Sequence, residues 1–268
     1  ILAAQLSTEK RRPLGVGIIN FAYWLAKNDL NYQHIDTDGL ALVDEWAEAW
    51  SYYLIKASAD LATEFGAPSG NMETKYGHGI TPNQTYKKDL DELVPHVERM
   101  DWGTLRAQLK DTGIRNSTLM ALMPAETSAQ IANATNGIEP PRSLISIKQS
   151  KHGVLKQVVP EYKRLKNKYD LLWDQQSPEG YIKIMAVLQK YIDQGISVNT
   201  SYNPVYFEDE KIPMSTMLQH LLMFYKLGGK QLYYFNTNDG QGEIDVSKMM
   251  GELEVVEVDD EDCEGCTI

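Results

Sequence analysis

Residues 116–128 read Asn-Ser-Thr-Leu-Met-Ala-Leu-Met-Pro-Ala-Glu-Thr-Ser, and this stretch decides the fold. Residues 119–123 form a short apolar run, which is typical of a strand buried on both faces. Pro124 ends that run, and hydroxyl residues follow where a helix would begin. A buried strand that leads into a helix is characteristic of α/β folds, so we predict the α/β class.

The segments on either side supply helices and further short strands. From Asp38, which we expect to be the N-cap, apolar residues recur at helical spacing as far as a stop at Gly66. Residues 144–148 and 154–159 flank a glycine-containing segment and predict a hairpin. The remaining expected elements are helices at 21–26, 102–110, 161–173, 179–194 and 213–227 and a strand at 231–235.

Composition and charge exclude several classes of protein. The 268 residues are 43% hydrophobic, enough for one large domain or two small ones, and no run reaches the roughly 18–20 apolar residues of a membrane helix. The net charge is −11, and eight carboxylates fall in residues 251–268 without a Lys or Arg, which leaves −3 for the rest. We therefore expect a folded body at 1–240, a flexible acidic tail at 241–268, and no duplex nucleic acid as partner.

The only two cysteines, Cys263 and Cys266, both lie in that acidic tail. A zinc half-site is disfavoured because the five histidines show no helical pairing and no second Cys-x-x-Cys exists, so we expect no metal. A structural disulfide would close a very small loop and stabilise little. A redox-active dithiol on a mobile arm remains the favoured interpretation, with an incidental pair as the alternative.

Two short segments have the residue types of a binding site. Pro124, Ala125, Glu126, Thr127 and Ser128 stand where a strand passes into a helix, and a helix start offers free N–H groups to an anion. Plain helix capping is the alternative for this segment. Downstream, a stretch rich in Asn, Gly and Pro ends at Arg142, whose guanidinium could bind phosphate.

Tyr233 and Tyr234 are neighbours in the predicted strand 231–235. In a regular strand their side chains would point to opposite faces. The functional alternative is a pair of phenols close enough to pass an electron and a proton, which requires the backbone to depart from regular strand geometry. The sequence leaves both interpretations open.

Several of these motifs together resemble the large catalytic subunit of class I ribonucleotide reductase. The resemblance rests on Leu-Gly-Val-Gly-Ile-Ile-Asn-Phe-Ala-Tyr at 14–23, Gly-Ile-Arg-Asn-Ser-Thr at 113–118, Ala-Leu-Met-Pro-Ala-Glu-Thr-Ser at 121–128, Asn-Ala-Thr-Asn-Gly-Ile-Glu-Pro-Pro-Arg at 133–142, the segment around Tyr233-Tyr234 and the terminal cysteines. The motifs occur in family order over nearly the whole chain. The resemblance implies the carboxyl-terminal part of a ten-stranded α/β barrel with a flexible acidic tail.

The resemblance also implies roles for the residues singled out above. Residues 124–128 would hold the diphosphate of a ribonucleoside diphosphate, with Arg142 as an added cation, although Ala125 stands where many members have a hydroxyl residue. Tyr233 and Tyr234 would relay the radical from a metal-containing small subunit. Cys263 and Cys266 would be the shuttle dithiol, reduced by thioredoxin or glutaredoxin. No cofactor would be bound by this chain itself.

The departures from the family pattern define what the chain would need. The family's thiyl cysteine, its active-site cysteine pair and its N-terminal allosteric cone have no counterpart here. The leading hypothesis is therefore a carboxyl-terminal portion, from a split gene or an intact protein, that acts in the cytoplasm with an N-terminal portion of the large subunit. The rivals are a non-catalytic nucleotide-binding or redox adaptor protein and a remnant that only binds the small subunit.

Overall fold

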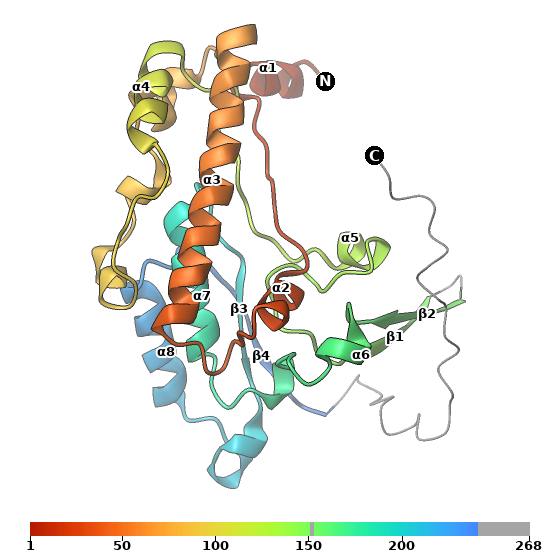
Figure 1. The fold of residues 1–268 in the computed structure, drawn as a ribbon. Helices are drawn as coiled ribbons and strands as arrows, with labels where there is room; N and C mark the ends of the chain where they lie inside the picture. The colour runs from red at the N-terminus through yellow and green to blue at the C-terminus, as the bar shows by residue number, and fades with distance from the viewer. Residues whose placement is uncertain (151–152, 241–268) are drawn as a thin grey trace.

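The computed structural model describes residues 1–150 and 153–240. A long helix, α3 (Thr37–Phe65), runs the length of one side of the molecule, and α7 (Glu179–Tyr191) and α4 (Trp102–Thr112) pack against it (Figure 1). Apolar residues of α3 and α7, including Ile55 and Val187, are completely buried in the core. The described residues form both helices and strands along the chain, which confirms the predicted α/β fold class.

The two ends of α3 are set by local chemistry. The Asp36 carboxylate accepts the Gly39 N–H at 2.8 Å, so the N-cap is Asp36 and the prediction of Asp38 is wrong. Asp38 instead lies in the first turn. The predicted stop is confirmed, because Gly66 adopts a φ of 77°, which favours glycine.

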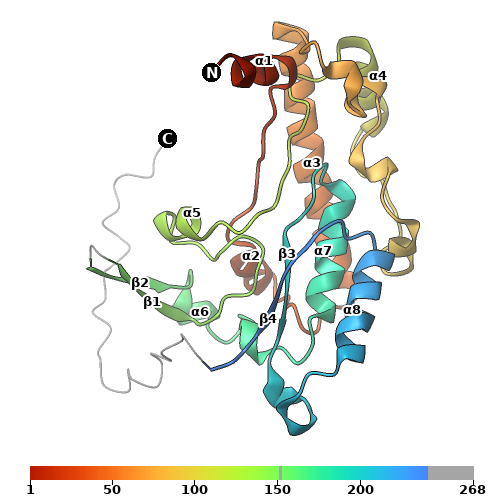
Figure 2. The same cartoon turned by 180° about the vertical axis from the view of Figure 1, so that it is seen from behind.

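Parallel strand segments form the centre of the molecule. Strand β3 (Val198–Tyr202) pairs in parallel with β4 (Leu232–Thr237), and single parallel bridges extend the array through Leu122–Ile196 and Val16–Met120. The apolar run that decided the fold class lies between two parallel neighbours, and its pairing is confined to single bridges. Leu119, Met120 and Leu122 are buried as expected, but Met123 is 42% exposed, so the run is not buried on both faces over its whole length. The array lies between the α3–α7 layer and the segments around α5 (Glu126–Ile131) and the hairpin (Figure 2).

The alternation along β3 gives the array two different faces. Val198, Thr200 and Tyr202 are buried, while Asn199 and Ser201 are only half-buried and face a pocket. Gly17 lies on the other edge of the array, and a Cβ at this position would come within 3.2 Å of both Ala121 and Met123. Close packing therefore explains why residue 17 is a glycine.

Most of the other elements follow the predictions, with two exceptions: an unpredicted helix at residues 2–11 and the segment 161–173. The hairpin is present as antiparallel strands β1 (Ile145–Ser150) and β2 (Gly153–Val158). The remaining elements are α1 (Leu2–Arg11), α2 (Phe21–Lys27), α6 (Tyr162–Leu165), α8 (Met214–Lys226) and seven short 3-10 turns among the described residues. The helices predicted at 21–26, 102–110, 179–194 and 213–227 and the strand at 231–235 are confirmed with shifted ends.

The helix predicted at 161–173 is wrong. Only one α-helical turn, Tyr162–Leu165, forms there, and the side chains of later residues bind elsewhere. Tyr169 donates to the Pro160 carbonyl, and the Asp170 carboxylate accepts the Gln33 N–H. These contacts fold the segment across the body instead of extending it as a helix.

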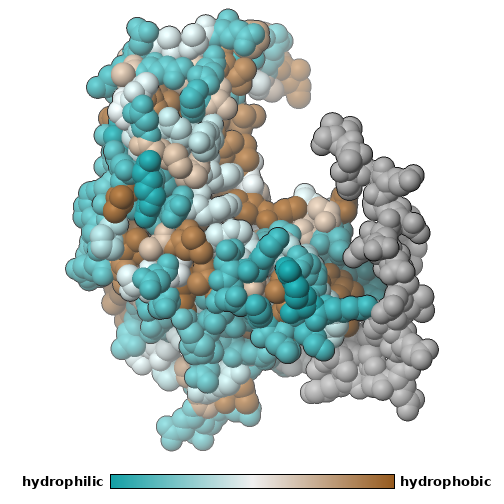
Figure 3. All heavy atoms as spheres, viewed as in Figure 1, coloured by the Kyte–Doolittle hydropathy of each residue, from teal (hydrophilic) through white to brown (hydrophobic). Residues whose placement is uncertain are grey.

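The described residues contain no helix long and apolar enough to cross a membrane. The space-filling view shows polar and apolar patches mixed over the visible face (Figure 3). The predicted tail, with Cys263 and Cys266, lies outside the described residues.

Candidate functional site

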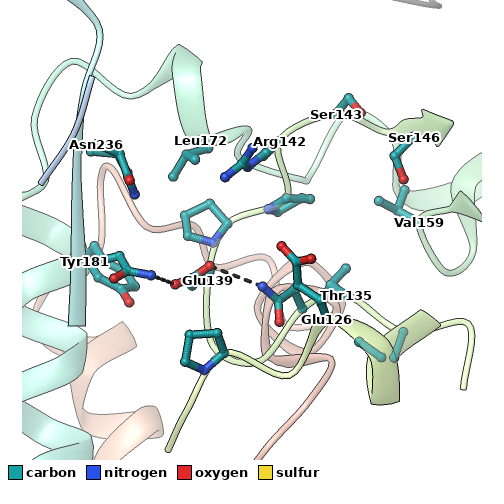
Figure 4. Close-up of a pocket in the computed structure, with 18 of the residues that line it drawn as sticks. Glu126, Thr135, Glu139, Arg142, Ser143, Ser146, Val159, Leu172, Tyr181 and Asn236 are labelled. Atoms are coloured by element: carbon teal, nitrogen blue, oxygen red, sulfur yellow. Dashed lines mark hydrogen bonds between the residues drawn. The ribbon is translucent and has the colours of Figure 1, made fainter. Parts of the chain in front are cut away.

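A pocket of about 760 Å³ opens on the polar face of the strand array (Figure 4). It is lined from four sides by the start of α5, the 134–144 loop, the base of the hairpin and the inner face of β3 and β4. Among the residues expected to form a site, five line it: Pro124, Glu126, Arg142, Tyr233 and Tyr234. The structure therefore brings three of the six predicted phosphate-binding residues and the predicted tyrosine pair to one cavity.

The start of α5 is only partly as expected. Ala125 is the N-cap residue, and α5 has six residues, so the helix is short. The Ala125 N–H donates to Asn136 Oδ1 at 2.8 Å, which commits that amide to the protein itself. Thr127 and Ser128 are exposed, but like Ala125 they do not line the pocket. Of the predicted binding residues, the pocket is therefore lined by Pro124, the acidic Glu126 and the basic Arg142.

Tyr233 and Tyr234 lie on the same side of their strand because the ladder is irregular there. Val198 pairs with Leu232, but the next residue, Asn199, pairs with Tyr234, so Tyr233 is an extra residue in a β-bulge. The expectation for a regular strand, one tyrosine on each face, is wrong.

The bulge brings the two phenol rings together. Their centroids are 4.1 Å apart at an interplanar angle of 51°, and the Tyr234 hydroxyl donates to the Tyr233 hydroxyl at 3.4 Å. Both side chains are about half exposed, at 48% and 54%. The hydrogen bond with Tyr234 raises the pKa of Tyr233, so that phenol stays protonated at neutral pH.

Glu139 was not predicted as a site residue, yet its carboxylate lies at the floor of the pocket (Figure 4). Its Oε1 accepts the Asn199 amide at 2.5 Å, and its Oε2 accepts the Asn136 amide at 3.3 Å. Burial raises the pKa of Glu139, while the hydrogen bond from Asn199 and the positive charge of Arg142 lower it; the net change is upward. The available signal was its place in the polar 133–142 stretch, but its partner Asn199 lies 60 residues away in the sequence.

No group of three or more His, Cys, Asp or Glu within the described ranges 1–150 and 153–240 could hold a metal ion. The pocket is lined by the carboxylates of Glu126 and Glu139, the guanidinium of Arg142 and the two adjacent phenols.

The parallel strand segments packed against helices, with a polar pocket on one face, define the α/β class of domains. The particular family follows from sequence comparison: residues 2–235 match the family described as "Ribonucleotide reductase, barrel domain". The chain belongs to that family.

Three similar curated proteins are each named as the alpha subunit of a ribonucleoside-diphosphate reductase. The Haemophilus influenzae protein is 53% identical over 246 residues, which cover 91% of this chain and 32% of that protein. The Escherichia coli protein, named ribonucleoside-diphosphate reductase 1 subunit alpha, is 52% identical over 242 residues, which cover 90% of this chain and 31% of that protein. The Enterobacteria phage T4 protein is 40% identical over 262 residues, covering 97% and 33%. The chain thus spans about a third of the length of these relatives.

Proposed function

We propose that this chain is the carboxyl-terminal portion of a ribonucleoside-diphosphate reductase large subunit. In that role it takes part in the radical-based reduction of ribonucleoside diphosphates to deoxyribonucleotides for DNA synthesis. It supplies the residues that bind the substrate diphosphate, the tyrosine relay and the shuttle dithiol.

The observation that carries the proposal is the tyrosine pair at the wall of the pocket. Two phenols with hydroxyl oxygens 3.4 Å apart are close enough for an electron and a proton to pass between them. The β-bulge places these neighbouring residues on one side of the strand, which departs from regular strand geometry. Such bulges are common next to functional sites. The pair opens on the same cavity as Glu126 and Arg142, so a radical that arrives there is delivered next to the substrate.

Substrate binding is assigned to Pro124, Ala125, Glu126, Thr127, Ser128 and Arg142. The start of α5 lies at the pocket, and the free N–H groups of a helix start favour an anion. Arg142 adds a positive charge to the lining of the same pocket. The Ala125 amide contributes through the shape of the turn, because it already donates to Asn136.

Partners supply the rest of the reaction. The chain has no cysteine before Cys263, so the thiyl cysteine and the active-site cysteine pair come from an N-terminal portion of the large subunit. The radical comes from a metal-containing small subunit. Cys263 and Cys266 give two electrons to the active-site disulfide and receive two from thioredoxin or glutaredoxin, which places the protein in a reducing compartment, the cytoplasm.

The test is reduction of a ribonucleoside diphosphate by this chain mixed with an N-terminal large-subunit portion, a radical-bearing small subunit and thioredoxin. We expect turnover that stops when any one component is omitted. Tyr233→Phe, which removes the phenol O–H, should lower turnover to the level seen without the small subunit while nucleotide binding is retained. Tyr53→Phe, at an exposed tyrosine of α3, is the matched control and should leave turnover unchanged.

Two results would contradict the proposal. Turnover that survives Tyr233→Phe would exclude the relay assignment. An inactive complex of verified, folded components would favour the nucleotide-binding or redox adaptor, or the remnant that only binds the small subunit.

A further inference from the structure

We propose that Glu139 is a positioning residue that holds the substrate-binding turn and the tyrosine pair in a fixed relation to each other. The inference rests on the function proposed above and adds to it a residue that neither touches the substrate nor carries the radical. It comes from a continuous set of hydrogen bonds that crosses the floor of the pocket.

One arm of this set leads from Glu139 to the substrate-binding turn. Glu139 Oε2 accepts the Asn136 Nδ2 amide at 3.3 Å, and Asn136 Oδ1 accepts the Ala125 N–H at 2.8 Å. Ala125 is the N-cap of α5, so this bond sets where the helix begins. The backbone that would meet the diphosphate is therefore fixed through Asn136.

The other arm leads to the tyrosine pair. Glu139 Oε1 accepts the Asn199 Nδ2 amide at 2.5 Å, and Asn199 Oδ1 accepts the Tyr234 N–H at 3.1 Å. Tyr234 is the residue that rejoins the ladder after the bulge. The Asn199 side chain therefore fixes the backbone at the point where the two phenols are brought together.

The arrangement requires a carboxylate at position 139. Each asparagine uses its oxygen to accept a backbone N–H, so each must present its NH₂ group to Glu139. An ionised carboxylate has two oxygens and no donor, and it can accept from both amides at once. A glutamine of the same shape would accept from one asparagine and direct its own NH₂ against the NH₂ of the other.

The same logic predicts which double variants restore the set. In Glu139→Gln with Asn199→Asp, the glutamine donates to the new carboxylate and still accepts from Asn136. The second aspartate oxygen then accepts the Tyr234 N–H. Glu139→Gln with Asn136→Asp is the mirror case, in which Asp replaces the partner that holds Ala125. Both double variants keep the net charge of the wild type.

The experiment measures kcat and KM for a ribonucleoside diphosphate in the reconstituted complex. Glu139→Gln should lower kcat/KM by about tenfold to a hundredfold, since small displacements of reacting groups cost rates of that order. Asn136→Asp and Asn199→Asp alone should also be impaired, because each sets two carboxylates against each other. Each double variant should recover most of the wild-type kcat/KM. Glu208→Gln, the same change at an exposed site, is the control and should have no effect.

A second readout separates this inference from the proposed function. Amide hydrogen exchange of the chain should be faster at Ala125 and Tyr234 in Glu139→Gln, unchanged in α7, and restored in the double variants. Unchanged exchange, or no recovery in either double variant, overturns the role of Glu139. Altered exchange with normal kcat/KM shows a purely structural link and overturns the positioning role. An inactive wild-type complex with the expected exchange pattern overturns the proposed function instead, and with it any catalytic consequence of the link.

Discussion

The helical side and the pocket side of the molecule both bury carboxylates, but different groups offset the cost of burying each negative charge. On the helical side, Asp44 and Glu48 of α3 are fully buried and meet Arg99, and Asp44 also meets Lys190, itself 1% exposed. On the pocket side, the half-buried Glu139 is held by two neutral amides. The carboxylates of the first cluster are buried in the core while Arg99 reaches the surface, and the second cluster opens on a cavity.

The pKa values of the two glutamates move in opposite directions. Burial by itself raises the pKa of Glu48, but hydrogen bonds from the Trp102 indole and from Arg99 outweigh it, and the pKa is lowered. Burial also raises the pKa of Glu139, and there the hydrogen bond from Asn199 offsets only part of the increase. Where hydrogen bonds fully offset the cost of burial, the carboxylate stays ionised in the core. Where they offset only part of that cost, the carboxylate is costly to keep ionised.

The difference separates the residues that hold the fold from those that shape the site. The helical cluster joins α3 to α7 and to the 97–102 segment, so its loss should affect the whole fold. The pocket cluster joins only the start of α5 to the bulge in β4, so its loss should affect geometry more than stability.

The largest stability effect is expected for Asp44→Asn. The variant leaves Lys190 buried without its counter-charge and directs an amide NH₂ toward Arg99, so we expect a loss of about 3–5 kcal/mol in the free energy of unfolding. Urea denaturation at neutral pH measures it.

Asp60→Asn is the matched control on the same helix. Asp60 pairs with Lys56 at the surface, and its side chain is 51% exposed, so the same substitution should cost about 0.5 kcal/mol or less. Equal losses in the two variants would show that burial does not distinguish these ion pairs.

A smaller effect, with a pH signature, is expected for Glu48→Gln. At neutral pH the lost charge-assisted hydrogen bonds should cost about 2 kcal/mol. Because the folded-state pKa lies below the ordinary 4.5, Glu48 stabilises the fold above pH 4.5, and this contribution disappears as the pH falls through the folded-state pKa. The stability difference between wild type and variant should therefore shrink on acidification, as urea midpoints from pH 7 to pH 3 would show. A difference that stays constant over this range would contradict the lowered pKa.

The sequence predicts most of the helical side. The spacing of apolar residues in α3 is periodic over its whole length, and a glycine that adopts a positive φ ends it. Such signals are local, so they survive without knowledge of the tertiary structure. The prediction of a helix at 161–173 is wrong because contacts with Gln33 and Pro160 set the direction of the chain there. No local sequence pattern contains such contacts.

The pocket side is predictable in its residues but not in its geometry. The motif at 124–128, Arg142 and the tyrosine pair can all be found in the sequence, and they do approach one cavity, apart from Ala125, Thr127 and Ser128. The bulge that unites the tyrosines depends on the register between β3 and β4, which neither strand specifies alone. Glu139 is missed because one of its two partners is distant in sequence, and only the folded chain brings it there.

The smallest stability effect is expected for Glu139→Gln, and its pH dependence should have the opposite sign to that of Glu48→Gln. At neutral pH the variant should lose about 1 kcal/mol or less, because it gives up one hydrogen bond to a neutral amide but also removes a charge that burial disfavours. Since the folded-state pKa of Glu139 is raised, the folded wild type takes up a proton before the unfolded chain does as the pH falls toward 4.5. The wild type should therefore gain stability relative to Glu139→Gln as the pH falls toward 4.5. Relative to Glu48→Gln, the wild type should instead lose stability as the pH falls below 4.5. If urea midpoints show both differences changing with the same sign, the two carboxylate clusters do not differ in the way their contacts indicate.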